Sequence, residues 1–453
     1  MKMQSDHLKT EGDINLSPVR KRWQDQHVNE ETQEILAEDE QYFLHQSMST
    51  PCLNVITKCE GIYLTDNQGR KVMDFHGNNV HQVGFSHPHV IAAVKEQLDQ
   101  LSFSTRRYTN QKAIELAKRL AELAPGTLNR VLLAPGATSA VGMALKLARI
   151  ATGKYKVASM WDSFHGASLD AISVGGEAVF RRGMGPLLPG VIHVPPVNTY
   201  RGMFGESVRD DIIFAKHLEY VMEKDGEIGA VIIETVRNTD VQIPSKGYLQ
   251  AVREICDRCG ALLILDETAI AFGRTGKMFA FEHYDIVPDM VVVGKGLGGG
   301  VFPIAALIAK EELNLAQHIS LGHYTHEKSP VGAAAALAML EVLELENLLT
   351  RVEELSPYIR AQLYGLMEEV PFIGDIRGIG LLFGVELVKD RISKEPACEE
   401  AERVMYHCLE QGLSFKVSQG NVLQLSPPLV IRREEVDHAL AILRSAFAGL
   451  KTV

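Results

Sequence analysis

The sequence predicts an α/β protein with a large domain, built on a mostly parallel sheet between helices, and a smaller α/β domain at the carboxy terminus. Short apolar runs typical of buried strands alternate along the chain with amphipathic stretches of helical spacing. A chain of 453 residues is long enough for two domains. Its 46% hydrophobic and 23% charged residues are ordinary for a globular protein.

The elements of the large domain follow in chain order. Its buried strands are expected at 131–133, 156–160, 230–233, 261–265, 290–293 and 304–308. Apolar residues recur at helical spacing from Ala140 to Ala151, and a further helix is expected over 248–259. An alanine-rich helix after Pro330 leads into the helical stretch 341–367. The segments 378–386 and 422–425 are expected to be strands of the smaller domain.

We therefore predict three parts: an amino-terminal arm that also contributes to the small domain (1–75), the large domain (76–345) and the small carboxy-terminal domain (346–453). Residues 1 to about 50 are polar and charged and lack long periodicity. We expect them to form an arm or helix that packs on another subunit.

Charge and cysteine content exclude several classes of protein. A net charge of −11 with no basic block argues against a nucleic-acid partner. No apolar run reaches the length of a membrane span and the first residues lack a signal-peptide core, so the protein is expected in the cytoplasm. Cys256 and Cys259 form the single CxxC pair, but no further thiol or imidazole ligands follow at close spacing. No metal site is expected.

Two charged residues at strand ends carry the chemistry. Lys295 follows the apolar run 290–293 and stands among glycines, where an amine against low-dielectric walls loses its proton easily and can attack an aldehyde. Asp266 ends the run 261–265, and a carboxylate there can keep a pyridinium nitrogen protonated. Each residue alone also fits a structural role, as a lysine reaching for water or an Asp-Glu helix cap. Together they predict a pyridoxal 5′-phosphate site.

The sequence around these two residues resembles the class III (ornithine/omega) aminotransferases. The similarity is strongest over 266–284, at Pro288-Asp289 and in the glycine-rich run 295–300, and it extends from about Gly61 to the carboxy terminus. The resemblance implies the type I fold of pyridoxal-phosphate-dependent transferases, with a seven-stranded sheet. It also implies that Lys295 forms the Schiff base with the cofactor, that Asp266 holds the ring nitrogen, and that the enzyme is a homodimer or higher homo-oligomer with a shared active site.

Other cofactor-binding residues follow from the same resemblance. Small residues at the start of a helix leave backbone N–H groups open to a phosphate, and Gly136, Ala137 and Thr138 stand at such a start. An ordinary glycine–alanine turn with a threonine cap is the alternative if this segment is taken alone. Phe164 and His165 match the aromatic-His-Gly motif, whose ring stacks on the pyridine.

Three further residues complete the predicted cofactor set. Thr268, where the family usually has valine or isoleucine, is expected near the opposite face of the ring. Glu234 begins the segment that usually reads Glu-Pro-Val and is included in the set. Thr325 resembles the threonine that reaches the cofactor phosphate of the neighbouring subunit.

Departures from the family pattern indicate a different substrate. Amino-acid-specific members carry an arginine where this chain has Gln424, and a neutral amide cannot replace a guanidinium on a carboxylate. Arg106, Arg107 and Lys328 are cations that suit a phosphonate or phosphate dianion. Their alternative is a solvated surface. Asn79 can hold a substrate hydroxyl, although a cap or turn role is equally consistent with the sequence.

These departures, above all the segment 322–330 with Asp266-Glu-Thr268, resemble a lyase branch of the family that acts on (R)-1-hydroxy-2-aminoethylphosphonate. The resemblance implies proton abstraction and β-elimination to phosphonoacetaldehyde and ammonia, without a second substrate. An omega-aminotransferase acting on an amine or aminophosphonate is the first alternative, because a fold does not fix a function. A non-catalytic cofactor-binding protein is the second.

Overall fold

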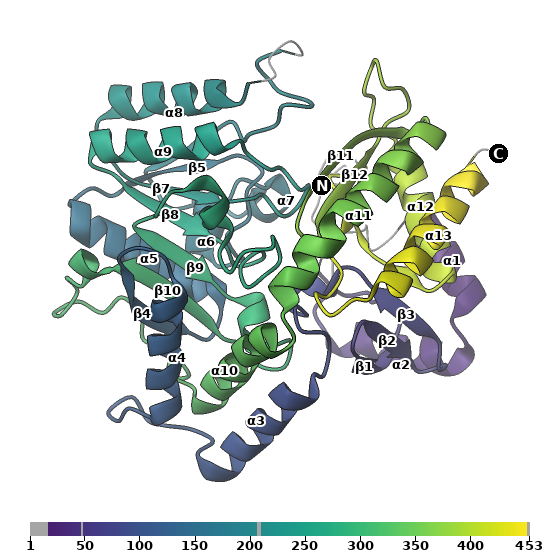
Figure 1. The fold of residues 1–453 in the computed structure, drawn as a ribbon, viewed down its shortest axis with the longest axis horizontal. Coiled ribbons are helices and arrows are strands. Elements are labelled where there is room, and N and C mark those ends of the chain that lie inside the picture. The colour runs from purple at the N-terminus through teal and green to yellow at the C-terminus, as the bar shows by residue number, and fades with distance from the viewer. Residues whose placement is uncertain (1–16, 47–48, 206–209, 451–453) are drawn as a thin grey trace.

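The computed structural model describes residues 17–46, 49–205 and 210–450, which form two lobes (Figure 1). The larger lobe contains a seven-stranded sheet of order β4-β10-β9-β8-β7-β5-β6. Its strands are β4 (Leu128–Ala134), β5 (Lys156–Met160), β6 (Val191–Val194), β7 (Ile228–Glu234), β8 (Leu262–Asp266), β9 (Met290–Val293) and β10 (Ala305–Lys310). β10 is antiparallel to both its neighbours, and the other pairs are parallel. The predicted fold is confirmed.

Helices cover both faces of this sheet. Alternate residues of β8 separate two hydrophobic clusters, with Leu263 and Leu265 in one and Ile264 in the other. The helices of this lobe are α3 (Pro88–Gln100), α4 (Gln111–Leu123), α5 (Ala137–Thr152), α6 (Leu169–Val174), α7 (Ala178–Arg181), α8 (Ile212–Asp225), α9 (Lys246–Cys259) and α10 (Pro330–Leu345). Short 3₁₀ turns are η2 (Gly77–Asn79), η3 (Ala280–Tyr284), η4 (Lys295–Gly298) and η5 (Glu311–Leu313).

The smaller lobe combines both ends of the described chain (Figure 1). One sheet has the order β1-β2-β3-β13 and the other β11-β12-β15-β14. Its strands are β1 (Ile56–Glu60), β2 (Tyr63–Asp66), β3 (Lys71–Asp74), β11 (Ile373–Ile379), β12 (Leu382–Leu387), β13 (Leu413–Ser414), β14 (Lys416–Ser418) and β15 (Val422–Leu425). Its helices are α1 (Pro18–His27), α2 (Glu30–Tyr42), α11 (Leu348–Glu369), α12 (Cys398–Glu410) and α13 (Arg433–Leu450). Parallel pairing of β13 with β3 joins the two ends, whereas the domain limits at 75/76 and 345/346 stay predictions.

The structure corrects two details of the predicted elements. The segment 378–386, expected as one strand, contains the end of β11, a turn at residues 380–381 and most of β12. The chain turns there because Gly380 has a φ of +56°, and a Cβ at this position would lie 2.3 Å from the Arg274 carbonyl oxygen. The edge strand β6 was missed, since His193 interrupts its short apolar run. Asn347, with a φ of 50°, separates α10 from α11.

The amino-terminal segment packs on its own chain in part. The Trp23 ring of α1 lies 6.3 Å from the Tyr406 ring of α12, between centroids. By contrast, Tyr42 and Phe43 at the end of α2 are exposed, so packing of this part on another subunit stays a prediction. The parts of that prediction on residues 1–16 and 47–48 lie outside the described residues.

The described residues contain neither a membrane-spanning helix nor a cluster of metal ligands. None of the helices in this part of the chain combines the length and apolar character needed to cross a bilayer. No group of three histidine, cysteine, aspartate or glutamate side chains in the same part of the chain is placed to hold a metal ion. All six cysteines are free thiols, and Cys256 and Cys408 are buried.

Candidate active site

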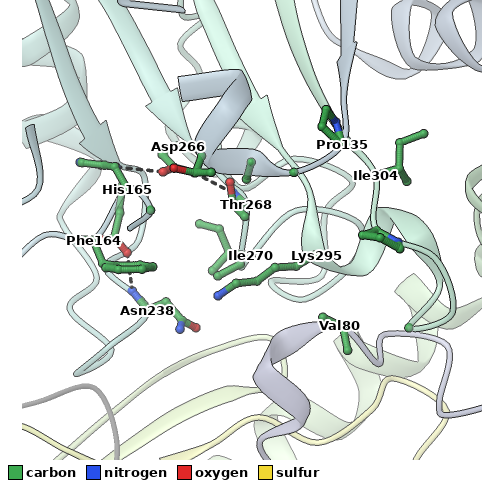
Figure 2. Close-up of a pocket in the computed structure, with 18 of the residues that line it drawn as sticks. Val80, Pro135, Phe164, His165, Asn238, Asp266, Thr268, Ile270, Lys295 and Ile304 are labelled. Carbon is green, nitrogen blue, oxygen red and sulfur yellow. Dashed lines mark hydrogen bonds and ion pairs between the residues drawn. The ribbon is translucent and has the colours of Figure 1, made fainter. Parts of the chain in front are cut away.

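A cavity of about 450 Å³ opens at the carboxyl ends of the parallel strands (Figure 2). Glu234 ends β7, Asp266 ends β8, and Lys295 follows β9 by two residues. All three line the cavity, as do the first residues of α5 after β4. This is the position where open α/β sheets bind ligands, because neighbouring strands all release their chains there.

Asp266 lies at the inner end of the cavity and is only 6% exposed. Its Oδ2 is 2.9 Å from His165 Nδ1, and its Oδ1 accepts a hydrogen bond from the Thr268 backbone N–H at 3.0 Å (Figure 2). Burial by itself raises the pKa of a carboxyl group, but the hydrogen bonds from His165 and Thr268 outweigh it and hold the pKa of Asp266 below its ordinary value. The site therefore keeps a buried negative charge.

Glu267, the next residue, points away from the cavity. Its carboxylate accepts hydrogen bonds from the Thr235 hydroxyl at 2.8 Å and from the backbone N–H groups of Ala280 and Phe281 at 2.7 and 2.8 Å. Burial raises the pKa of Glu267 to about 7. Of the two adjacent acids, Asp266 serves the cavity and Glu267 supports the turn η3.

Lys295 sits in a strained backbone conformation, with a φ of 45° that is uncommon for residues other than glycine. Figure 2 shows its side chain crossing the cavity with the amine directed toward the side where Phe164 and Asn238 lie. The following residue, Gly296, packs closely on the buried Gln82 side chain, since a Cβ at this position would lie 2.0 Å from Gln82 Oε1. Tight packing below the turn thus directs the amine into the cavity.

The amino terminus of α5 forms another wall. Gly136, in extended conformation, precedes the helix and no side chain caps it. Gly136, Ala137 and Thr138 all line the cavity, and the Thr138 hydroxyl is 2.7 Å from the Ser168 hydroxyl. Uncapped backbone N–H groups and the positive end of the helix dipole make this wall suited to an anion such as a phosphate.

Glu234 organises the wall opposite α5. Its carboxylate accepts hydrogen bonds from the backbone N–H groups of Phe164 and Asn238, both at 3.1 Å. Burial raises the pKa of Glu234. The Phe164 ring packs against Phe180 with centroids 4.8 Å apart, and Phe164 lines the cavity as a flat apolar surface.

The predicted cations and Thr325 do not line this cavity within one chain. Arg106 and Lys328 line a second cavity, and Arg106 Nη2 is 3.0 Å from Glu327 Oε2. Arg107 and Thr325 are exposed. Since the family resemblance implies a site shared between subunits, their contribution to a partner's cavity stays a prediction.

Asn79 lies behind the cavity wall and is 1% exposed. Its Nδ2 donates to Asn238 Oδ1 at 3.2 Å, and its Oδ1 accepts from the Ser426 hydroxyl at 2.7 Å. Gln424 Nε2 also donates to Asn238 Oδ1, at 3.0 Å. Asn238 itself lines the cavity and was missed by the sequence analysis. Its place just beyond the end of β7 was the signal available.

The cavity fits pyridoxal 5′-phosphate. The buried Asp266 carboxylate suits the ring nitrogen, Phe164 offers a flat face, and the open end of α5 suits the phosphate. Lys295 supplies the amine on the same cavity (Figure 2). Each of these groups lies on a different strand end, so the fold brings together what the sequence spreads over 160 positions.

Comparisons with known proteins agree with this geometry. The model of the class III aminotransferases matches residues 44–447. The chain is 55% identical to the (R)-1-hydroxy-2-aminoethylphosphonate ammonia-lyase of Vibrio splendidus (strain 12B01), over 98% of this chain and 96% of the relative. It is 37% identical to a probable aminotransferase of Mycobacterium tuberculosis, over 86% of this chain and 89% of that protein.

Solved structures show the same architecture. An aminotransferase of Bacillus anthracis superposes with a TM-score of 0.86 at 31% identity, over 92% of this chain and 98% of that one. An (S)-enantioselective omega-transaminase of Thermomicrobium roseum superposes with a TM-score of 0.85 at 29% identity, with the same coverage of 92% and 98%.

Proposed function

The chain belongs to the class III aminotransferase family, and we propose that it is an ammonia-lyase that converts (R)-1-hydroxy-2-aminoethylphosphonate into phosphonoacetaldehyde and ammonia. It is an enzyme, and its cofactor is pyridoxal 5′-phosphate. The substrate and the reaction rest on the likeness to the Vibrio splendidus lyase and on one feature of the site, the amide cluster around Gln424.

That cluster is the observation on which the proposal depends. Gln424, which replaces the carboxylate-binding arginine of amino-acid-specific members, is fully buried and bonded to Asn238. Among the described residues that line the cavity, Lys295 is the one lysine or arginine. Within the described part of the chain, no guanidinium lines this cavity to clamp the carboxylate of an amino acid.

The side chains present can carry the proposed reaction. Bound pyridoxal 5′-phosphate would supply an aldehyde for the substrate amine and a ring that accepts an electron pair. The Lys295 amine, which points into the cavity (Figure 2), would be the base that takes the proton from the carbon bearing nitrogen. Asp266 remains ionised beside His165 and would stabilise positive charge at the ring nitrogen of the bound cofactor.

The proposed elimination balances without a second substrate. Loss of one proton from the carbon bearing nitrogen and of hydroxide from the neighbouring carbon removes one water. Hydrolysis of the released enamine consumes one water, so the net products are phosphonoacetaldehyde and ammonia. A keto acid, which an aminotransferase needs as amino acceptor, takes no part.

We further propose that the active form is at least a homodimer. Arg106 and Lys328 lie at a second cavity and Thr325 is exposed, so these residues can serve a cavity of the partner subunit. The cations would then supply the positive charge that a phosphonate dianion requires and that the Lys295 cavity lacks. A cytoplasmic location stays a prediction from the sequence.

The test is an ammonia assay on purified, cofactor-loaded enzyme without keto acid. We expect ammonia and phosphonoacetaldehyde in equal amounts from 1-hydroxy-2-aminoethylphosphonate, and none from 2-aminoethylphosphonate, which has no leaving group on the neighbouring carbon. The Lys295→Ala variant is the control and is expected to release no ammonia above background.

An omega-aminotransferase is the second candidate, because the solved transaminases share this fold at TM-scores of 0.85 and above. Steady amino transfer from 2-aminoethylphosphonate to pyruvate, with no ammonia from the hydroxylated compound, would establish that activity and overturn the lyase proposal.

A further inference from the structure

We propose that Asn238 recognises the substrate hydroxyl, by donating a hydrogen bond from Nδ2 into the Lys295 cavity. The inference rests on the proposed function and adds a specificity-determining residue to it. Asn238 is 3% exposed, lines the cavity, and lies on the side toward which the Lys295 amine points (Figure 2).

The Asn238 amide is fixed in orientation. Its backbone N–H is bonded to Glu234 Oε2 at 3.1 Å. Its Oδ1 accepts from Asn79 Nδ2 at 3.2 Å and from Gln424 Nε2 at 3.0 Å. With the oxygen saturated by two donors, the remaining amide group is Nδ2, which has no hydrogen-bond partner in the part of the chain that the structure describes. A donor held in this way is preorganised for a ligand.

The side-chain partners of Asn238 come from two distant parts of the fold. Asn79 belongs to η2, Gln424 to β15 of the small lobe, and Ser426 supports Asn79 from behind at 2.7 Å. Gln424 does not line the cavity and is 0% exposed, so it acts through Asn238 as a positioning residue. The cluster therefore fixes one amide at the junction of the two lobes.

Charge decides which group of the substrate this amide suits. A phosphonate dianion is bound by cations, whereas Asn238, Asn79 and Gln424 are all neutral. A neutral N–H donor is matched to a hydroxyl oxygen, which accepts a hydrogen bond without bringing charge. The hydroxyl is also the group that distinguishes the proposed substrate from 2-aminoethylphosphonate, and a site built to bond a hydroxyl rejects the analogue that lacks it.

The experiment measures the preference for the hydroxyl by binding alone. Dissociation constants of 1-hydroxy-2-aminoethylphosphonate and 2-aminoethylphosphonate are determined by calorimetry on cofactor-loaded Lys295→Ala protein, where turnover does not follow binding. We expect this protein to favour the hydroxylated ligand. The preference is the dissociation constant of 2-aminoethylphosphonate divided by that of 1-hydroxy-2-aminoethylphosphonate. In the Lys295→Ala protein, a further Asn238→Ala or Asn238→Asp substitution should reduce this ratio about tenfold to a hundredfold. Both ligands share the amine and the phosphonate, so effects on those groups cancel in the ratio.

Thr239→Ser is the matched control, because Thr239 lines the same cavity beside Asn238 and serine keeps a hydroxyl for the bond to Glu177. It should keep the ratio, and thermal unfolding should show that all variants are folded. An unchanged ratio in both Asn238 variants, an equal loss in Thr239→Ser, or no preference in the parent protein would each overturn the inference. Absence of ammonia from the wild type would overturn the proposed function instead, and the binding ratio would still be readable.

Discussion

The Lys295 cavity and the second cavity, which Arg106 and Lys328 line, hold charge in opposite ways. In the first, Asp266, Glu234 and His165 are largely shielded from water, and each is bonded to a fixed partner. In the second, Arg106 is exposed and paired with Glu327 at the surface. Charges interact strongly in a low-dielectric interior and weakly in water. The first cavity therefore holds its charged groups in place within one chain, whereas we propose that the cations of the second serve the cavity of a partner subunit.

After the loss of Lys295 itself, a change at Asp266 should have the largest effect. Asp266→Asn removes the buried charge but keeps the shape, so the cofactor should stay bound while ammonia release falls about a hundredfold to a thousandfold, or roughly 2.7 to 4 kcal/mol. Single-turnover kinetics and the absorption spectrum of the bound cofactor measure the two parts. Asp257→Asn, at an exposed carboxylate on α9, is the control. A loss smaller than about tenfold would contradict the role of Asp266.

A change at Arg106 tests whether the second cavity serves a partner. Arg106→Ala should cost less than about 1 kcal/mol of stability, because its ion pair with Glu327 is exposed. If the guanidinium binds the phosphonate, the substitution should also lower kcat/KM, by an amount that corresponds to about 1.5 to 3 kcal/mol of lost transition-state stabilisation.

Mixed dimers make the same comparison sharper. When Arg106→Ala and Lys295→Ala subunits are combined, one site regains both an intact lysine and the partner's arginine. Activity above the sum of the two parents is expected, whereas no recovery would show that the arginine does not act across the interface. Lys118→Ala, at an exposed cation on α4 that is outside the predicted substrate set, is the control for the kinetic effect.

The stability of the fold should also depend on pH, through the buried residue His81. Burial lowers the pKa of His81 to about 3, with a smaller contribution from Arg274. The unfolded chain binds a proton at this residue below about pH 6.5 and the folded chain does not, so stability falls as the pH falls through that value. Between pH 7 and 5 this linkage costs about 2 kcal/mol. Urea unfolding should show that His81→Phe, whose ring can still pack on Phe85, loses less stability over this range by about that amount. Equal losses in the two proteins would contradict the assignment.

Local sequence was sufficient to predict which residues lie at the ends of the buried strands. The apolar runs before Asp266 and Lys295 form β8 and β9, and the small residues after β4 begin α5. Parallel strands release their chains at one edge of a sheet, so residues that follow such runs meet without further information. Of two adjacent acids, the family resemblance assigned the role to Asp266, and Asp266 lines the cavity whereas Glu267 is bonded to Thr235.

What the sequence by itself determined is therefore the sheet, the family and the presence at the sheet edge of the residues that we propose to hold the cofactor. Only the tertiary structure decided which neutral side chains complete the cavity and which cations stay outside it. Asn238 is bonded to Asn79 and Gln424 across 159 and 186 positions of the chain, and Arg106 to Glu327 across 221. Such contacts leave no periodic pattern or fixed spacing in the sequence, because they are set by how distant segments pack rather than by the preferences of any local segment.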